Sequence, residues 1–346
     1  MRLKDSSANS TVAAFTELAK AAVPKTLSKK LKATRTSKGE ASRAGVGWYH
    51  LLRSKTEHFS IVDAHRGNCF CAAPFSGLCS SLRMYKKPRR ILLKFGSGIL
   101  TRPRANALDE KQFGRLTADV AQLVRGGCEC IIVSSGAVAA GMRVVGLRER
   151  PLDLTTGQAC AAVGQSKLMH LYASMFAKHH LNVAQLLLTH SDLDSRIRHQ
   201  NAKNTLRRLL ECKNVVPVVN ENDSVALEEL RFGDNDRLSA EVAVLAEAQL
   251  LILLTGVDGL MDHAGKRIPM VADVGEAVHF VRKEKSRFSV GGMVTKLEAV
   301  RLATAVGIPS VIANGRRAGI ISRIAAGERV GTLFPVRGKN SDTHSL

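Results

Sequence analysis

Apolar and polar positions from Arg90 onward form short apolar runs separated by longer segments with helical spacing. The apolar runs predict buried strands at ILLKF (91–95), CIIVSS (130–135), VAQLLLT (183–189), VVPVVN (215–220), LLILLT (250–255) and PSVIAN (309–314). Helical spacing predicts helices within 113–124, 165–180, 198–213, 239–248 and 293–307. Strands that alternate with helices and are almost wholly apolar are typical of a parallel sheet covered on both faces. The pattern therefore predicts an α/β fold with a mostly parallel open sheet between two helical layers.

The first 89 residues differ from this pattern. They are rich in Ser, Ala, Thr, Lys and Arg, and they show no sustained periodicity. Residues 1–90 hold 18 Lys and Arg against 5 Asp and Glu, so +13 of the formal charge of +21 belongs to them. Three interpretations are open: a disordered basic extension, which we favour, a transit peptide, or untranslated sequence before a start at Met84. We expect the folded domain at 90–336 and a short tail at 337–346.

Composition limits the cellular setting and the partners. The seven cysteines form no C-x-x-C pairs, which favours a reducing compartment, and no apolar run approaches the length of a membrane span. Aromatic residues make up 4%, which argues against a surface that stacks on bases. We therefore expect a cytoplasmic protein that binds neither nucleic acid nor membrane. Nucleic-acid binding through the basic extension is the competing interpretation, and it predicts steeply salt-dependent binding.

The residues that follow the strands carry the candidate chemistry, because ligands of open α/β sheets bind beyond the carboxyl ends of the strands. Lys94 lies at the end of the first strand, where Phe95 and then Gly96-Ser97-Gly98 follow it. Lys296 lies one turn into a helix preceded by Gly291-Gly292. Neither a G-x-G-x-x-G nor a G-x-x-x-x-G-K-[ST] motif is present. Two lysines and several glycine turns at one sheet edge favour a phosphoryl group in transfer, whereas the alternative for each lysine is a solvated surface position.

Two clusters of carboxamides and carboxylates follow the strand at 215–220. The first is Asn220-Glu221-Asn222-Asp223, and the second is Asn235-Asp236. Asp223 can pair with an ammonium group while the Asn side chains donate and accept hydrogen bonds, so the clusters fit a zwitterionic substrate. Helix capping is the alternative, and it does not account for so many such residues.

Seven segments, in this order and spacing, resemble the glutamate 5-kinases of the amino acid kinase family. They are KFGSGILT, IVSSGAVAAGM, QSKLMHLY, VVPVVNENDSV, FGDNDRLSAEVA, LLTGVDGLM and GGMVTKLEAVRLA, and they span roughly residues 90–336. The resemblance implies a three-layer αβα sandwich. It also implies an enzyme that transfers the γ-phosphoryl group of ATP to the γ-carboxylate of L-glutamate. The product would be L-glutamyl 5-phosphate, the first intermediate of proline biosynthesis.

The resemblance implies a role for each matching residue. Lys94 would contact ATP and the transferring phosphoryl group, Lys296 would stabilise the developing charge, and Asp236 would orient both lysines. Ser135, Asp223 and Asn235 would hold glutamate. The remaining nucleotide-binding positions would be Thr255, Gly256, Val290, Gly291, Gly292, Met293, Val294 and Thr295. ATP would carry the Mg²⁺, so the resemblance implies no metal held by the protein.

Further expectations from the resemblance are a homo-oligomer and feedback inhibition by proline through the loop 228–232. The chain departs from the family at Gly256, where Asp is common, and at the loop SVGGMVTK, where a Gly-Thr pair often precedes the two glycines. It also stops short of the PUA domain that many bacterial members carry at the C-terminus. A kinase for another acid, such as N-acetylglutamate, aspartate or carbamate, is the alternative within the family, and Asp223 favours a substrate with a free ammonium.

Overall fold

The structure is a computed structural model that describes residues 49–53, 59–63, 69–70, 87–102, 107–225, 234–280 and 292–336. It divides the chain into two units, Met1–Gly77 and Leu78–Leu346. In the part of the chain that the structure describes, no helix is both long and apolar enough to cross a membrane.

The first unit contains a small antiparallel sheet that the sequence pattern did not predict. Its strands are β1 (Tyr49–Arg53), β2 (Phe59–Asp63) and β3 (Cys69–Phe70), in the order β1-β2-β3. β1 pairs with β2 from Tyr49 opposite Asp63 to Arg53 opposite Phe59. Most of residues 1–89 lie outside the described residues, as does Met84. The expected disordered extension therefore stays a prediction.

The second unit is built on a seven-stranded sheet of order β10-β9-β8-β4-β5-β7-β6. All neighbouring strands run parallel except β10, which pairs antiparallel with β9 at the edge. The strands are β4 (Arg90–Phe95), β5 (Glu129–Ser134), β6 (Asn182–Leu188), β7 (Val215–Glu221), β8 (Leu250–Thr255), β9 (Ser310–Asn314) and β10 (Thr332–Phe334). The six predicted strands are thus confirmed, whereas the short edge strand β10 was missed.

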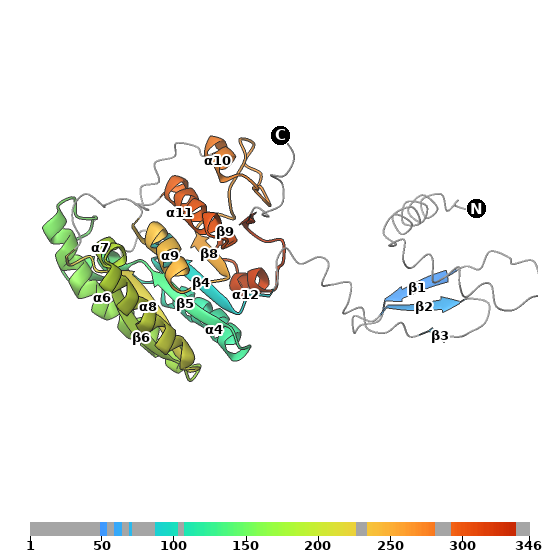
Figure 1. Cartoon of the computed structure of the whole chain (residues 1–346), viewed down its shortest axis with the longest axis horizontal. Coiled ribbons are helices and arrows are strands. Elements are labelled where there is room, and N and C mark those ends of the chain that lie inside the picture. The colour runs from blue at the N-terminus through green and yellow to red at the C-terminus, as the bar shows by residue number, and fades with distance from the viewer. Residues whose placement is uncertain are drawn as a thin grey trace, which may run out of the picture. The chain divides into compact units, whose positions relative to one another are not determined.

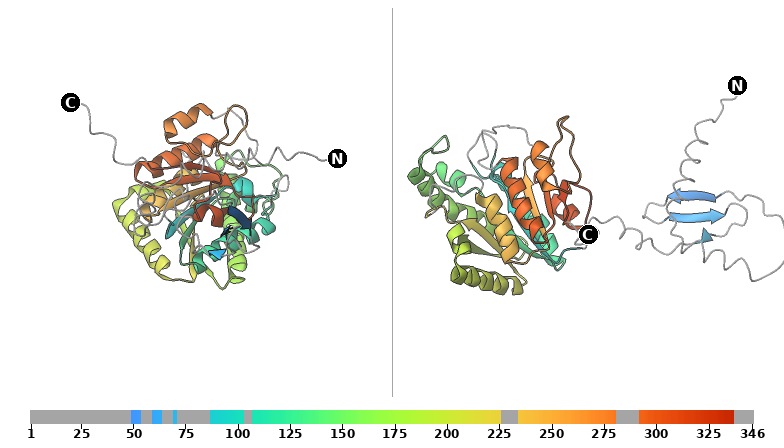
Figure 2. Two further views of the ribbon diagram at one scale, coloured as in Figure 1. Left: turned by 90° about the vertical axis from the view of Figure 1, so that its right-hand side faces the viewer. Right: turned by 45° about the horizontal axis from the view of Figure 1, so that its top comes forward.

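Helices cover both faces of this sheet (Figure 1, Figure 2). They are α3 (Ser97–Leu100), α4 (Glu110–Arg125), α5 (Ala137–Met142), α6 (Leu154–Ala177), α7 (His190–Asp194), α8 (Arg196–Glu211), α9 (Asp234–Leu245), α10 (Val274–Ala277), α11 (Met293–Ala305) and α12 (Ile320–Ala325). Buried residues of α4, α6 and α12 pack on one face, and those of α8, α9 and α11 pack on the other. The predicted α/β sandwich with a mostly parallel sheet is confirmed.

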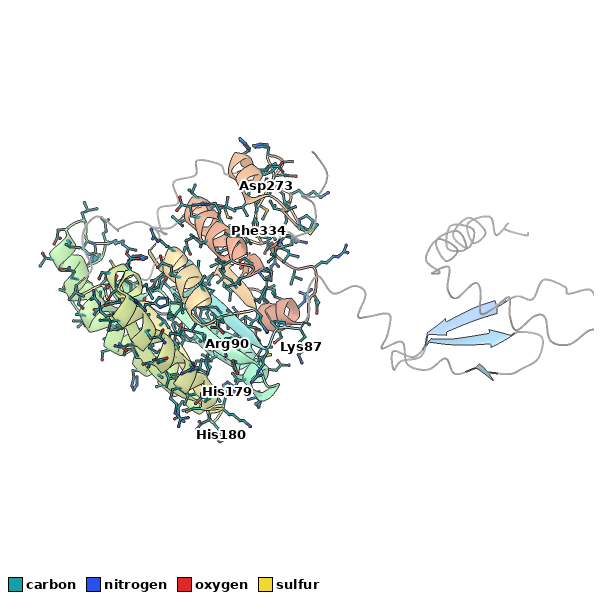
Figure 3. The ribbon with its side chains drawn as sticks, in the orientation of Figure 1. Lys87, Arg90, His179, His180, Asp273 and Phe334 are labelled. Carbon is teal, nitrogen blue, oxygen red and sulfur yellow. The ribbon has the colours of Figure 1, made fainter. Side chains whose placement is uncertain are left out.

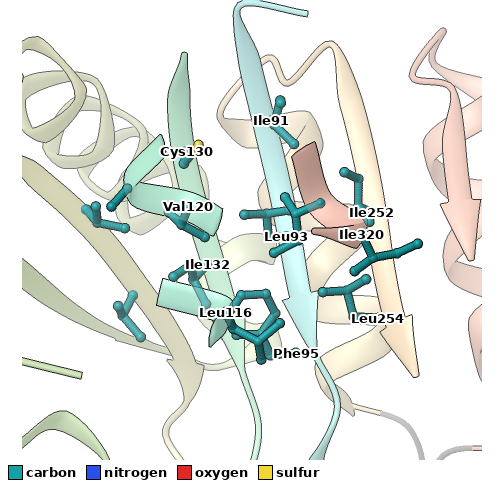
Figure 4. Close-up of a cluster of buried hydrophobic side chains, with 14 of the residues drawn as sticks. Ile91, Leu93, Phe95, Leu116, Val120, Cys130, Ile132, Ile252, Leu254 and Ile320 are labelled. Carbon is teal, nitrogen blue, oxygen red and sulfur yellow. The ribbon is translucent and has the colours of Figure 1, made fainter. Parts of the chain in front are cut away.

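Residues on β4 alternate between the two faces of the sheet. Ile91, Leu93 and Phe95 belong to the apolar cluster under α4, α6 and α12, and Figure 4 shows them beside Ile132, Ile252 and Leu254 of the neighbouring strands. Leu92 belongs to the cluster under α8, α9 and α11. Because side chains alternate along a strand, Lys94 lies on the same face as Leu92. The lysine therefore lies one residue before the end of an apolar strand, on the face that α9 and α11 cover.

The parallel strands share one direction, so their ends define two edges of the unit. Arg90 begins β4, and His179 and His180 precede β6; all three are labelled in the lower part of Figure 3. The candidate residues of the sequence analysis follow the opposite, carboxyl ends of β4, β5, β7 and β8. Because the neighbouring strands are paired in register, these loops meet at one edge.

Candidate functional site

Lys94, Lys296 and Asp236 meet between the sheet and two helix N-termini. Lys94 is the fifth residue of β4, Asp236 lies in the first turn of α9, and Lys296 lies in the first turn of α11. All three are buried, with exposed fractions of 5%, 6% and 1% for Lys94, Lys296 and Asp236. Helices α9 and α11 pack against each other, and α9 also packs on β4. The sequence prediction that these residues come together is thus matched by the geometry, while their roles stay predictions.

Asp236 bridges the two lysines with its two carboxylate oxygens. Its Oδ1 pairs with the Lys94 ammonium, and its Oδ2 lies 3.1 Å from Lys296 Nζ. Thr295 Oγ1 donates to the same Oδ2 at 2.7 Å. Lys296 Nζ also donates to the carbonyl of Gly292 at 3.3 Å. Asp236 therefore holds both ammonium groups together near the carboxyl end of β4.

The electrostatics of this cluster favour an anion. Burial acts to raise the pKa of Asp236, but the charges of Lys94 and Lys296 outweigh it and hold the pKa at about 2. Desolvation lowers the pKa of Lys296, and its attraction to Asp236 acts in the opposite direction. Two cations and one anion leave a net positive charge, and the N-termini of α9 and α11 add their partial positive charges. Such a place stabilises a phosphate oxygen.

A second group of polar side chains forms a neutral chain of hydrogen bonds beside this cluster. Asn235 Nδ2 donates to Ser135 Oγ at 3.2 Å and to Asn220 Oδ1 at 3.1 Å. Asn220 Nδ2 in turn donates to Gln165 Oε1 at 2.8 Å. The structure therefore brings Ser135 and Asn235, two of the predicted substrate-binding residues, into contact. We call Ser135, Asn235, Asn220 and Gln165 the amide chain.

Asp223 lies just past the end of β7, in the same stretch of chain as Asn220. It interacts electrostatically with Arg150: desolvation lowers the pKa of this arginine, and the Asp223 carboxylate acts to raise it. Arg150 was not predicted as a site residue from the sequence, because a lone arginine in a loop carries no pattern. In the described structure the Asp223 carboxylate thus has a cationic neighbour before any substrate binds.

The candidate nucleotide residues divide into two groups. Thr255 ends β8 and Gly256 follows it, and a side chain at Gly256 would meet no atom within 4 Å. Gly292, Met293, Val294 and Thr295 begin α11 with Lys296. Val290 and Gly291 lie outside the described residues, as does the loop 228–232. Thr295 was predicted only to line the nucleotide site. Its hydroxyl also donates a hydrogen bond to Asp236, which the sequence did not predict.

Gln165 was not recognised as a substrate-binding candidate from the sequence, and Asn220 was named only as a member of the cluster that fits a zwitterion. Gln165 appeared only within a segment that carried the family resemblance, because a single glutamine on a helix gives no chemical signal. Asn220 was expected to hydrogen-bond, and it links Gln165 to Asn235. Only the tertiary structure, which brings Gln165 of α6 to Asn220 of β7, reveals this connection.

A pocket of about 380 Å³ lies at the carboxyl ends of β8 and β9. Its lining includes Asp258, Asn314 and Arg317 but none of the clustered lysines. Arg317 donates to both oxygens of Asp258, at 3.1 and 2.8 Å, and Asn314 Nδ2 donates to Asp258 Oδ1 at 2.9 Å. Because these polar groups bind one another, we assign no substrate to this pocket.

Comparisons with known proteins find relatives along most of the chain. The model of the amino acid kinase family matches residues 89–314. A glutamate 5-kinase of Carboxydothermus hydrogenoformans is 46% identical over 256 residues, which is 72% of this chain and 68% of that protein. A glutamate 5-kinase of Thermus thermophilus is 46% identical over 254 residues, with the same shares. That of Citrifermentans bemidjiense is 44% identical over 265 residues, 74% of this chain and 70% of the relative.

Solved structures with much lower sequence identity share the fold. A UMP kinase from Bacillus anthracis has a TM-score of 0.50 at 16% identity, covering 73% of this chain and 98% of the other. An N-acetylglutamate synthase from Neisseria gonorrhoeae has a TM-score of 0.52 at 14% identity, covering 75% of this chain and 63% of the other. At such identities the likeness is one of fold alone.

Proposed function

The chain belongs to the amino acid kinase family and, within it, to the glutamate 5-kinases, and on that premise we propose how its residues catalyse the reaction. The reaction transfers the γ-phosphoryl group of ATP to the γ-carboxylate of L-glutamate and yields L-glutamyl 5-phosphate, the first intermediate of proline biosynthesis. The observation that carries the proposal is the bridging of Lys94 and Lys296 by one buried carboxylate, Asp236, at two helix N-termini.

In the proposed mechanism, a γ-carboxylate oxygen of glutamate attacks the γ-phosphorus, and the bond from that phosphorus to the β–γ bridging oxygen breaks. Charge spreads over the phosphoryl oxygens and onto the leaving ADP during this step. Lys94, at the end of β4, contacts the transferring group. Lys296, at the start of α11, stabilises the charge from the side of the nucleotide. Both act without reorganisation, because Asp236 already holds them in place.

Asp236 acts as a positioning residue and not as a base. Its pKa of about 2 keeps it ionised at neutral pH, and both of its oxygens are engaged with Lys94, Lys296 and Thr295. The reaction needs no base, because the γ-carboxylate of glutamate is itself ionised at that pH. Two cations held by a carboxylate that does not take up protons therefore fit phosphoryl transfer to a carboxylate.

We assign the rest of glutamate to Ser135, Asn235 and Asp223. Asn235 adjoins Asp236 in α9, so a substrate that contacts Asn235 can place its γ-carboxylate towards the two lysines that Asp236 holds. The Asp223 carboxylate pairs with the α-ammonium, which then competes with Arg150. A substrate without a free ammonium, such as N-acetylglutamate, loses this pairing.

We assign the nucleotide to Thr255, Gly256 and the start of α11. The described residues include no group of three or more His, Cys, Asp or Glu side chains that could hold a metal. Mg²⁺ commonly binds through substrate phosphates, so it enters our proposal as MgATP and compensates phosphate charge. The absence of a metal held by the protein stays a prediction.

We also propose that proline inhibits by competing with glutamate, through the loop 228–232, and that the enzyme is a cytoplasmic homo-oligomer. These expectations come from the family. Inhibition by proline that excess glutamate fails to relieve would contradict a shared site. Light scattering of the purified chain decides the oligomeric state.

The test of the proposed function is an ATP-dependent assay of the purified full chain with a panel of acids. Hydroxylamine traps an acyl phosphate as a hydroxamate, so the assay detects the product class directly. We expect product with L-glutamate, and little with aspartate, N-acetylglutamate or carbamate. A higher kcat/KM with any of these three acids than with L-glutamate would show that this acid, and not glutamate, is the preferred substrate.

A further inference from the structure

Two buried polar atoms of the amide chain have no hydrogen-bond partner among the described residues. They are Gln165 Nε2 and Asn235 Oδ1. Most buried polar atoms in folded proteins are paired, and an unpaired one lowers stability. Two unpaired atoms in one hydrogen-bonded chain, which contains the predicted glutamate residues Ser135 and Asn235, indicate that a ligand completes them.

A backbone group fixes the direction of every amide in this chain. The backbone N–H of Glu221 donates to Asn220 Oδ1 at 2.9 Å, and an N–H can only donate. Asn220 therefore presents its Nδ2 to Gln165, whose Oε1 must face Asn220 to accept. Gln165 Nε2 is left at one end of the chain as a donor. By the same reasoning Asn235 gives its Nδ2 to Asn220, and its Oδ1 is left as an acceptor.

Close packing of two helices holds Gln165 in this place. The preceding residue, Gly164, lies so near α5 that a side-chain Cβ there would come within 1.8 Å of the Ala137 carbonyl oxygen. Ala137 begins α5, two residues after Ser135. The position of Gln165 is thus tied to the loop that carries Ser135, at the other end of the amide chain.

We propose that Gln165 binds the α-carboxylate of L-glutamate through Nε2, while Asn235 Oδ1 accepts from the α-ammonium. This assignment rests on the proposed function. A carboxylate only accepts and an ammonium only donates, so one fixed donor and one fixed acceptor match the two α-groups of a free amino acid. Gln165 thereby selects for an α-carboxylate, as Asp223 selects for an α-ammonium.

The decisive variant is Gln165→Glu, which has nearly the same shape. It keeps an oxygen that accepts from Asn220 Nδ2, and it replaces only the outward donor by an acceptor that repels a carboxylate. We expect the KM for L-glutamate to rise tenfold or more, with a much smaller change in kcat. Gln200→Glu makes the same chemical change on an exposed part of α8 and should leave both constants unchanged.

Two glutamate analogues separate recognition from a structural effect. Glutarate lacks the α-ammonium, and 4-aminobutyrate lacks the α-carboxylate. Both analogues are tested as inhibitors of glutamate phosphorylation. In Gln165→Glu the inhibition constant of glutarate should rise by at least the same factor as the KM for glutamate, whereas that of 4-aminobutyrate should not rise. If Gln165→Glu does not fold, as judged by circular dichroism, Gln165→Met replaces it in the same comparison. We then expect the KM for glutamate to rise about tenfold.

The outcomes separate this assignment from the proposed function. A wild-type enzyme that forms no hydroxamate with glutamate overturns the function. An active wild-type enzyme whose Gln165→Glu variant keeps the wild-type KM overturns the assignment of Gln165 alone, because water would then be the partner of Nε2. Equal weakening of inhibition by glutarate and by 4-aminobutyrate would also overturn the assignment of Gln165, because this residue would then affect only the shape of the site.

Discussion

Asn235 and Asp236 are adjacent residues in α9, yet they belong to two opposite kinds of site. Successive side chains of a helix point about 100° apart. Asp236 faces Lys94 and Lys296 in a cluster where all three groups are charged and buried. Asn235 faces Ser135 and Asn220, in a chain of amides and a hydroxyl without a charged member. One residue step along α9 thus separates the charged cluster from the neutral amide chain.

The difference matches what each part of the substrate does. The phosphoryl group changes its charge distribution during transfer, so fixed cations beside it stabilise the transition state more than the ground state. The α-groups of glutamate keep their charges throughout the reaction, so the amide chain binds ground state and transition state alike. Loss of a charged-cluster residue should therefore lower kcat, and loss of an amide-chain contact should raise KM.

The strongest test of this contrast is Lys296→Ala. Removal of one preorganised electrostatic group typically costs about 10²–10³ in turnover. We expect kcat to fall by that factor while the KM for glutamate changes little, because Lys296 acts on the phosphoryl group. Steady-state kinetics with varied glutamate at saturating MgATP measure both constants.

A matched control lies on the same helix. Arg301 is an exposed cation of α11, and Arg301→Ala should retain wild-type kcat. Thermal melts of both variants exclude a general loss of folding. A well-folded Lys296→Ala enzyme with near-normal kcat would show that the phosphoryl group lies elsewhere.

A second test uses acid to discharge Asp236. Its pKa is about 2 in the folded protein, against about 3.9 for an unfolded Asp. A carboxyl group with a depressed folded pKa stabilises the protein above the unfolded value and loses this contribution as the pH falls through the folded value. Asp236 therefore contributes about 2–3 kcal/mol at pH 7, which disappears between about pH 4 and pH 2.

The measurement compares Asp236→Asn with wild type by urea unfolding at several pH values. At pH 7 the variant should be less stable by about 2–3 kcal/mol, and the gap should narrow steadily below about pH 4. Asn235→Asp is the contrasting variant, because it adds a charge to the neutral amide chain, whereas Asp236→Asn removes a charge from the charged cluster. A stability gap for Asp236→Asn that stays constant from pH 7 to pH 3 would contradict the depressed pKa.

The sequence predicted the charged cluster better than the amide chain, and the reason is physical. A lysine at the end of an apolar strand and a lysine after paired glycines stand out, because buried charge is costly and needs a partner. Amide side chains carry no such signal. The contact of Gln165 with Asn220 depends on how α6 packs, and the sequence pattern placed the start of this helix too late, at 165 instead of Leu154.

The fold shows the same division. Long apolar strands such as β4 and β8 were located to within a residue at each end, because an apolar run bounded by turns has few alternatives. The short elements β10, α5 and α12 were missed, since three to six residues give too few positions for a periodic pattern. Tertiary contacts decide those elements.

A third test, with a smaller expected effect, examines the α-groups. Asp223→Asn keeps the shape of the side chain and removes the charge that pairs with the substrate ammonium. We expect the KM for glutamate to rise about tenfold or somewhat more, with a smaller change in kcat. Glutarate has no ammonium, so its inhibition should not weaken in this variant. A variant that lost kcat and kept its KM would place Asp223 with the charged cluster.

The smallest effect is expected from removal of residues 1–83. This truncation tests whether the N-terminal segment contributes to the charged cluster or to the amide chain. The residues that form the charged cluster and the amide chain lie between Lys94 and Lys296, within the unit Leu78–Leu346. β4, the first strand of the seven-stranded sheet, begins at Arg90. The truncated chain should therefore retain both the kcat and the glutamate KM of the full chain, within a factor of about two. Circular dichroism verifies folding, and a folded truncation without activity would show that the extension takes part in catalysis or in the assembly that catalysis requires.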